Sequence, residues 1–190
     1  MALTFANKVT IGRILVVPFF IATILYYSWD REYLRFIALG FFLFAVISDV
    51  IDGYIARTRQ QKTKAGAILD PLADKLLLIS AFVFLTIQGR MFSSVQFPLW
   101  IVVAVISRDV ILLLGAMIIH LVQGDLTITP TRWGKAATFF QVIGILAVLL
   151  QWKVPTLLWY VTAGLTVISG LGYIRKGIKI LNDSTGKTRS

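Results

Sequence analysis

The sequence predicts an all-α integral membrane protein with six transmembrane helices and both termini in the cytoplasm. Of its 190 residues, 57% are hydrophobic and only 15% are charged, and the mean hydropathy is +0.81. Soluble domains carry about a quarter charged residues, so this composition indicates a membrane protein. The apolar residues form long runs separated by short basic segments, which is the pattern of repeated membrane crossings.

Each crossing needs about 20 mainly apolar residues. Six segments meet this requirement: 9–28, 34–57, 66–88, 97–122, 134–152 and 155–178. The connections between them are short, so we expect one transmembrane domain over residues 1–182. The polar stretch 183–190 is expected to be a disordered cytoplasmic tail.

The first three segments have recognisable ends. Segment 9–28 follows Lys8 and contains Arg13, but no small-residue cleavage site follows it, so we interpret it as a retained helix. Segment 34–57 ends at Arg57, and segment 66–88 begins at Gly66. Glycine at such a point lets a ligand approach the backbone closely.

The last three segments are bounded by basic and aromatic residues. Segment 97–122 carries Arg108 near its middle, where an unpaired cation is costly. Segment 134–152 begins beside Arg132 and Lys135, and segment 155–178 ends in a basic stretch. Tryptophans near the span ends are typical of an aromatic belt at the membrane surface; they are Trp29, Trp100, Trp133, Trp152 and Trp159.

The basic residues are distributed unequally between the two sides of the predicted bundle. One side carries Lys8, Arg57, Arg59, Lys62, Lys64, Arg132, Lys135, Arg175, Lys176 and Lys179, and the other carries Arg31, Arg35, Arg90 and Lys153. Positive charge prefers the cytoplasm, so both termini are expected there. The net charge of +10 therefore reflects topology and anionic lipid, and no nucleic-acid partner is expected. The absence of cysteine excludes disulfides, thiolate metal sites and cysteine nucleophiles.

Four of the nine acidic residues lie within two apolar segments: Asp49, Asp52, Asp70 and Asp74. The first pair has i,i+3 spacing and the second i,i+4, so each pair projects from one helix face. The predicted topology sets both pairs at matched depths, roughly 6–8 Å and 12 Å inside the cytoplasmic ends. Carboxylates gathered at membrane depth repel one another unless cations lie between them. We therefore predict a divalent metal site near the cytoplasmic surface.

The residues around the aspartates form a longer motif. Residues 49–57 read Asp-Val-Ile-Asp-Gly-Tyr-Ile-Ala-Arg, and residues 66–75 read Gly-Ala-Ile-Leu-Asp-Pro-Leu-Ala-Asp-Lys. This motif resembles the D-x2-D-G-x2-A-R-x8-G-x3-D-x3-D signature of the CDP-alcohol phosphotransferases at all eight fixed positions. The resemblance implies the six-helix fold of that family, a homodimer, CDP-diacylglycerol as donor and two Mg2+ or Mn2+ ions.

The resemblance also assigns roles by position. It implies that Asp49, Asp52 and Asp70 hold one metal, that Asp49, Asp70 and Asp74 hold the other, and that Asp74 is the general base. The residues implied to bind the CDP-lipid are Asp52, Gly53, Ala56, Arg57 and Gly66. An active site at these positions faces the cytoplasm from the cell (inner or plasma) membrane.

The acceptor alcohol is indicated by a second resemblance. Asn7, Thr10 and Arg13 match the N-x2-T-x2-R start of phosphatidylglycerophosphate synthases, and we expect Asn7 and Thr10 to contact the CDP-lipid. The predicted reaction is phosphatidyl transfer to glycerol 3-phosphate, with release of CMP and formation of phosphatidylglycerophosphate. A phosphorylated acceptor needs a basic pocket, for which the candidates are Arg108, Arg132 and Lys135.

Other interpretations remain open. Ser107-Arg108-Asp109-Val110 is similar to the cardiolipin synthases of this family, whose acceptor is phosphatidylglycerol. Neighbouring Arg108 and Asp109 point about 100° apart on a helix, so we expect them not to face each other. A divalent-cation transporter also has intramembrane carboxylates, but here they are confined to one half of the predicted membrane.

Overall fold

Six long α-helices make up most of the computed structural model, which describes residues 5–58, 64–89, 97–123, 132–153 and 156–187. Within these ranges it describes side chains except those of residues 5–8, 52–58, 64–71, 116–123, 156, 174 and 176–187. The helices are α1 (Phe5–Leu25), α2 (Tyr33–Thr58), α3 (Lys64–Ile87), α5 (Leu99–Gln123), α6 (Arg132–Leu149) and α7 (Thr156–Lys187). A single 3-10 turn, Trp29–Arg31, precedes α2, and no strand occurs in the described ranges.

The six predicted segments are thus confirmed as helices, with ends close to those expected. By length and composition alone, two stretches are apolar enough to span a bilayer, Tyr33–Ile51 and Arg132–Leu149, among the residues described. Val9–Leu25 and Leu157–Tyr173 are shorter apolar helices. α7 extends to Lys187 and so includes part of the stretch 183–190. The domain boundary after residue 182 and the disordered tail stay predictions.

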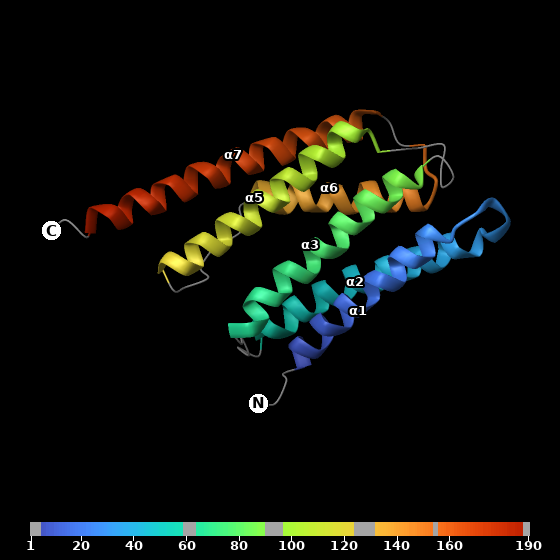
Figure 1. Ribbon diagram of the computed structural model, residues 1–190, viewed down its shortest axis with the longest axis horizontal. Coiled ribbons are helices and arrows are strands. Elements are labelled where there is room, and N and C mark those ends of the chain that lie inside the picture. The colour runs from blue at the N-terminus through green and yellow to red at the C-terminus, as the bar shows by residue number, and fades with distance from the viewer. Residues whose placement is uncertain (1–4, 59–63, 90–96, 124–131, 154–155, 188–190) are drawn as a thin grey trace. The chain divides into compact units, whose positions relative to one another are not determined.

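The helices drawn in Figure 1 belong to two compact units of the chain. The first comprises residues 1–99 and 143–154, and therefore holds α1, α2, α3 and the last part of α6. The second comprises residues 100–142 and 155–190, and holds α5, the first part of α6 and α7.

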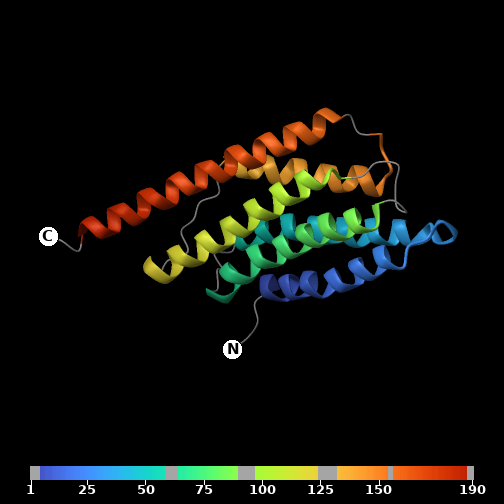
Figure 2. The same ribbon diagram turned by 45° about the horizontal axis from the view of Figure 1, so that its top comes forward.

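In the first unit, α1 packs against both α2 and α3, and α2 also contacts α3. α1 and α2 run antiparallel and side by side (Figure 2). Each buries a stripe of residues at alternating spacings of three and four, which is the period of one helix face. On α1 the stripe is Thr10, Arg13, Val17, Phe20 and Ile24, and on α2 it is Arg35, Ala38, Phe42 and Ala45. The rings of Phe20 and Phe42 lie 6.0 Å apart, which fixes the register of the two stripes.

The carboxyl end of α6 is closed within the first unit by a Schellman motif. The backbone N–H of Trp152 donates to Ala147 O at 2.8 Å, and that of Gln151 donates to Val148 O at 3.0 Å. Gln151 has a φ of 55°, the left-handed conformation that usually favours glycine.

The sequence places Arg35 among the charges on the outer side of the membrane. That side chain is instead buried: its Nη1 donates to Leu149 O at 3.1 Å.

In the second unit, α5 and α7 run side by side in the same direction (Figures 1 and 2). The rings of Trp100 and Tyr160 are 5.7 Å apart near the amino ends of the two helices. A Cβ built on Gly170 of α7 would lie 3.7 Å from Arg108 Cγ of α5, so the helices approach closely there. Thr162 and Thr166 are buried, and each satisfies its hydroxyl by donating to the carbonyl four residues earlier.

Large apolar side chains are exposed along all six helices. Examples from α1, α2, α5 and α7 are Leu15, Phe19, Phe36, Phe44, Val103, Leu114, Val167 and Leu171. Helices that expose apolar side chains in such number need an apolar surrounding, as a bilayer provides. Four tryptophans near helix ends, Trp29, Trp100, Trp133 and Trp152, are exposed in agreement with an aromatic belt. Trp159 is buried, so its place in the predicted belt is wrong.

Candidate active site

The aspartates continue the buried stripes of their helices. On α2, position 49 comes four residues after buried Ala45, and position 52 three residues later. On α3, positions 74 and 70 lie four and eight residues before buried Leu78, on a helix that also buries Ala73, Leu77, Ala81, Phe82 and Leu85. The helix faces that pack the first unit thus change from apolar to acidic near the carboxyl end of α2 and the amino end of α3.

The helix ends place the four positions at matched distances along α2 and α3. Asp52 is six residues before the end of α2, and Asp70 is six residues after the start of α3, or about 9 Å from each end. Asp49 and Asp74 are nine and ten residues from those ends, about 14–15 Å. Because α2 and α3 follow one another through a short connection, these ends lie at the same side of the first unit (Figure 1).

An ion pair connects this acidic region to α1. Arg13 Nη1 donates to Asp49 Oδ1 at 2.6 Å. The Arg13 side chain is 2% exposed, whereas that of Asp49 is 43% exposed. Asp49 Oδ2 has no hydrogen-bond partner within the described part of the chain. The carboxylate is therefore held at one oxygen and open at the other.

Among the residues with described side chains, Asp49 and Asp74 offer carboxylates, and no group of three possible metal ligands occurs there. Mg2+ and Mn2+ prefer carboxylate oxygens, and Asp49 offers a partly exposed one. Asp74 is half-buried on α3. The side chains of the remaining predicted site residues lie outside those described: Asn7, Asp52, Gly53, Ala56, Arg57, Gly66 and Asp70. Their backbones belong to α1, α2 and α3, but their roles stay predictions.

A second charged group lies within the second unit. Arg108 Nη1 donates to Asp109 Oδ1 at 2.6 Å, and Arg108 Nη2 donates to Ser169 Oγ at 2.7 Å. Arg108 is 5% exposed and Asp109 is 0% exposed. The expectation that the two neighbours do not face each other is wrong, because the long arginine side chain folds back onto the adjacent carboxylate.

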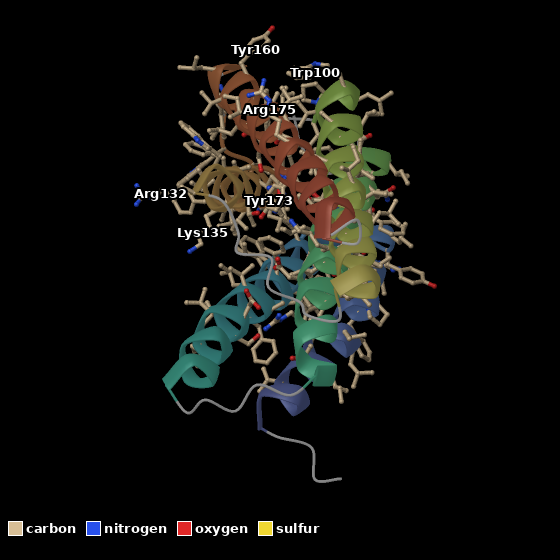
Figure 3. The ribbon with its side chains drawn as sticks, turned by 90° about the vertical axis from the view of Figure 1, so that its left-hand side faces the viewer. Trp100, Arg132, Lys135, Tyr160, Tyr173 and Arg175 are labelled. Carbon is tan, nitrogen blue, oxygen red and sulfur yellow. The ribbon has the colours of Figure 1, made fainter. Side chains whose placement is uncertain are left out.

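The three predicted acceptor residues differ in environment. Arg108 is buried and engaged by Asp109 and Ser169, whereas Arg132 and Lys135 are exposed at the start of α6. Figure 3 shows Arg132 and Lys135 on the side of α6 that faces away from α5 and α7. A phosphate clamp built from all three therefore stays a prediction.

Arg13 is a residue of the matched motif to which the sequence assigned no role at the site. It is the last fixed position of the N-x2-T-x2-R motif, and only Asn7 and Thr10 of that motif were expected at the site. Thr10, three residues earlier, is buried on the same face of α1. The register that pairs positions 20 with 42 and 13 with 49 also sets position 10 level with position 52 of α2.

Comparison with known proteins identifies the family of the chain. The chain matches the family model described as CDP-alcohol phosphatidyltransferase over residues 3–168. It is 30% identical to a Mycobacterium tuberculosis protein named "Probable phosphatidylglycerophosphate synthase", over 92% of this chain and 81% of the relative. It is 31% identical to the CDP-diacylglycerol–glycerol-3-phosphate 3-phosphatidyltransferase of Bacillus subtilis, over 94% and 97%. It is 29% identical to a CMP-forming cardiolipin synthase of Oryza sativa subsp. japonica, over 94% and 59%. The chain belongs to the CDP-alcohol phosphatidyltransferase family.

Proposed function

We propose that this protein transfers the phosphatidyl group of CDP-diacylglycerol to glycerol 3-phosphate, releasing CMP and forming phosphatidylglycerophosphate. The observation that carries the proposal is the family match over residues 3–168, together with relatives named for this reaction at 31% identity. Asp49 and Asp74, on helices of one packed unit, support it. A divalent-cation transporter is disfavoured by the same family membership.

Members of the family generally depend on a divalent metal. The proposed ligands are Asp49, Asp52 and Asp70 for one Mg2+ or Mn2+ ion, and Asp49, Asp70 and Asp74 for a second. When bound, the two ions supply positive charge against the diphosphate and the departing CMP. The partly exposed Oδ2 of Asp49 supports this assignment, since hard cations bind such oxygens.

The chain's own residues would carry out the transfer. The Asp74 carboxylate accepts the proton of the acceptor hydroxyl. The hydroxyl oxygen then forms a bond to the phosphorus of the phosphatidyl group, and the bond from that phosphorus to the CMP oxygen breaks. Gly53, Ala56, Arg57 and Gly66 hold the CDP moiety, with Arg57 suited to a diphosphate through its forked donors.

The family acts in membrane-associated lipid biosynthesis. We place this chain in the cell membrane as a homodimer of six-span subunits, with both termini and the active site on the cytoplasmic side. The exposed apolar side chains along all six helices support insertion in lipid. The excess of Lys and Arg on the side that holds Arg57, Lys64 and Arg132 supports the orientation.

A second acceptor, phosphatidylglycerol, is favoured by a specific observation. Arg108 is already neutralised by Asp109, so a phosphate at this point must replace a carboxylate that lies 2.6 Å from Nη1. The terminal glycerol of phosphatidylglycerol carries only uncharged hydroxyls at its far end, and these require no such exchange, because its phosphodiester lies on the lipid side of that glycerol. Relatives named cardiolipin synthase, at 29% identity, agree with this alternative.

The test uses purified full-length protein in detergent with CDP-diacylglycerol and Mn2+. Release of CMP is measured with glycerol 3-phosphate, with phosphatidylglycerol, and with neither acceptor. Release that requires glycerol 3-phosphate supports the proposed reaction, and release that requires phosphatidylglycerol assigns the alternative. Absence of CMP release with both acceptors, in a protein that carries Mn2+ across vesicle membranes, would support the transporter instead.

A further inference from the structure

We propose that Arg13 is a positioning residue of the metal site, which holds the Asp49 carboxylate in the orientation that binds metal. The inference rests on the proposed function, because it takes Asp49 as a metal ligand. It extends that function to α1, which carries none of the four aspartates.

The geometry that supports this role is an ion pair between the buried guanidinium of Arg13 and the partly exposed carboxylate of Asp49. Arg13 is buried, so the surrounding side chains restrict its guanidinium, and its Nη1 lies 2.6 Å from Asp49 Oδ1. Asp49 is 43% exposed and would otherwise be free to rotate about its side-chain bonds. The contact therefore selects one orientation of the carboxylate and leaves Oδ2 open.

The position of Arg13 on α1 explains why it is available for this task. The buried stripe of α1 is apolar at Val17, Phe20 and Ile24 and polar at Thr10 and Arg13. The polar part of the stripe lies level with the acidic part of α2, as the pairs Phe20–Phe42 and Arg13–Asp49 show. The acidic part of α2 therefore supplies Arg13 with a partner of opposite charge at its own level of the stripe.

Two opposite effects of Arg13 on metal binding are conceivable, and the structure favours one. A guanidinium competes with a cation for the same carboxylate, which would weaken metal binding. However, Arg13 occupies only Oδ1, and hydrogen bonds that orient a ligating carboxylate typically strengthen metal binding by about 10- to 100-fold. We infer that orientation outweighs competition, since the second oxygen stays accessible.

The test measures Mn2+ affinity of the full-length protein in detergent without acceptor, from the electron paramagnetic resonance signal of free Mn2+. Arg13→Met should weaken Mn2+ binding by about 10- to 100-fold. Arg13→Lys keeps the charge and a donor, so it should recover most of that loss. In turnover, Arg13→Met should raise the KM for Mn2+ while kcat at saturating Mn2+ changes much less.

Arg35→Met is the matched control. Arg35 is also a buried arginine of the first unit with an ion pair, to Glu32 at 2.5 Å, but it lies at the opposite end of α2 from Asp49. The Arg35→Met substitution should lower the unfolding temperature of the protein without changing its affinity for Mn2+. If Arg13→Met does not fold, Arg13→Gln, which removes the charge but keeps a polar side chain, gives the same comparison.

The results of this test separate a failure of the role of Arg13 from a failure of the proposed function. Wild-type protein that binds no Mn2+ and releases no CMP overturns both proposals. Wild-type protein that binds Mn2+, with equal or tighter binding by Arg13→Met, overturns only the role of Arg13. A loss of stability in Arg13→Met like that of Arg35→Met, with unchanged Mn2+ affinity, overturns it as well.

Discussion

Replacing Arg108 by Met tests whether the buried ion pair of the second unit stabilises the fold, binds the acceptor, or does both. Arg108 donates from Nη1 to Asp109 and from Nη2 to Ser169, and thereby connects α5 to α7. With exposures of 5% for Arg108 and 0% for Asp109, neither charge has access to bulk water. Removing the guanidinium takes away the cation that lies 2.6 Å from Oδ1 of this buried carboxylate.

The expected magnitude follows from that burial. Breaking a buried pair by removing one partner costs about 3–5 kcal/mol, whereas replacing both charges by neutral groups is often close to neutral. For a chain of this size, about 3–5 kcal/mol corresponds to a fall of roughly 6–20 °C in unfolding temperature. The double variant Arg108→Met with Asp109→Asn should recover most of this loss, since no buried charge remains.

The assay is thermal unfolding in detergent of the wild type, both single variants and the double variant, followed by CMP release at varied glycerol 3-phosphate. Equal stability of Arg108→Met and the wild type, or of the single and double variants, would refute the reasoning. The acceptor role predicts a stable double variant whose KM for glycerol 3-phosphate is raised roughly 10- to 100-fold, as loss of a hydrogen bond to a charged group of about 1.5–3 kcal/mol implies. A wild-type KM in that variant would remove Arg108 from the acceptor site.

Substitutions at three further positions give separate predictions. Asp74→Asn should abolish CMP release while CDP-diacylglycerol still binds, and full activity would exclude Asp74 as the base. Gln141 is 0% exposed, and neither atom of its side-chain amide has a hydrogen-bond partner in the described ranges. Gln141→Leu should therefore stabilise the protein by about 1–3 kcal/mol, as measured by thermal unfolding. A loss of stability would contradict this prediction. Gln151→Gly should add about 0.5–1 kcal/mol because φ is 55°, whereas Gln151→Ala should not, and equal effects would show that this φ carries no strain.

The helices were predictable because membrane insertion imposes a length of about 20 apolar residues on each segment. The acidic positions were predictable at the level of the backbone, since i,i+3 and i,i+4 spacings keep each pair on one face. Their matched depths followed from the short connection between segments 34–57 and 66–88, and the ends of α2 and α3 agree.

The contacts of individual arginines were not predictable from spacing. Arg13 and Asp49 are 36 residues apart, and only the packing register of α1 against α2 brings them together. The sequence predicted that Arg35 is a charge at the membrane surface, but its guanidinium donates a hydrogen bond to the backbone carbonyl of Leu149 at the end of α6. The helical angle between Arg108 and Asp109 describes their Cβ directions, whereas four flexible bonds let the guanidinium reach the neighbouring carboxylate.

In the proposed site, four aspartates on two helices hold two metal ions for a CDP-linked lipid. The most direct measurement is the number of Mn2+ ions bound per chain in the presence of CDP-diacylglycerol, by electron paramagnetic resonance, for the wild type and four single Asp→Asn variants. We expect two bound ions for the wild type and one for the variants at Asp52 and Asp74, because each of these residues binds a single ion. We expect none at the same Mn2+ concentration for the variants at Asp49 and Asp70, because these residues bind both ions. A wild type that binds no Mn2+, or four variants that each keep both ions, would contradict this proposal.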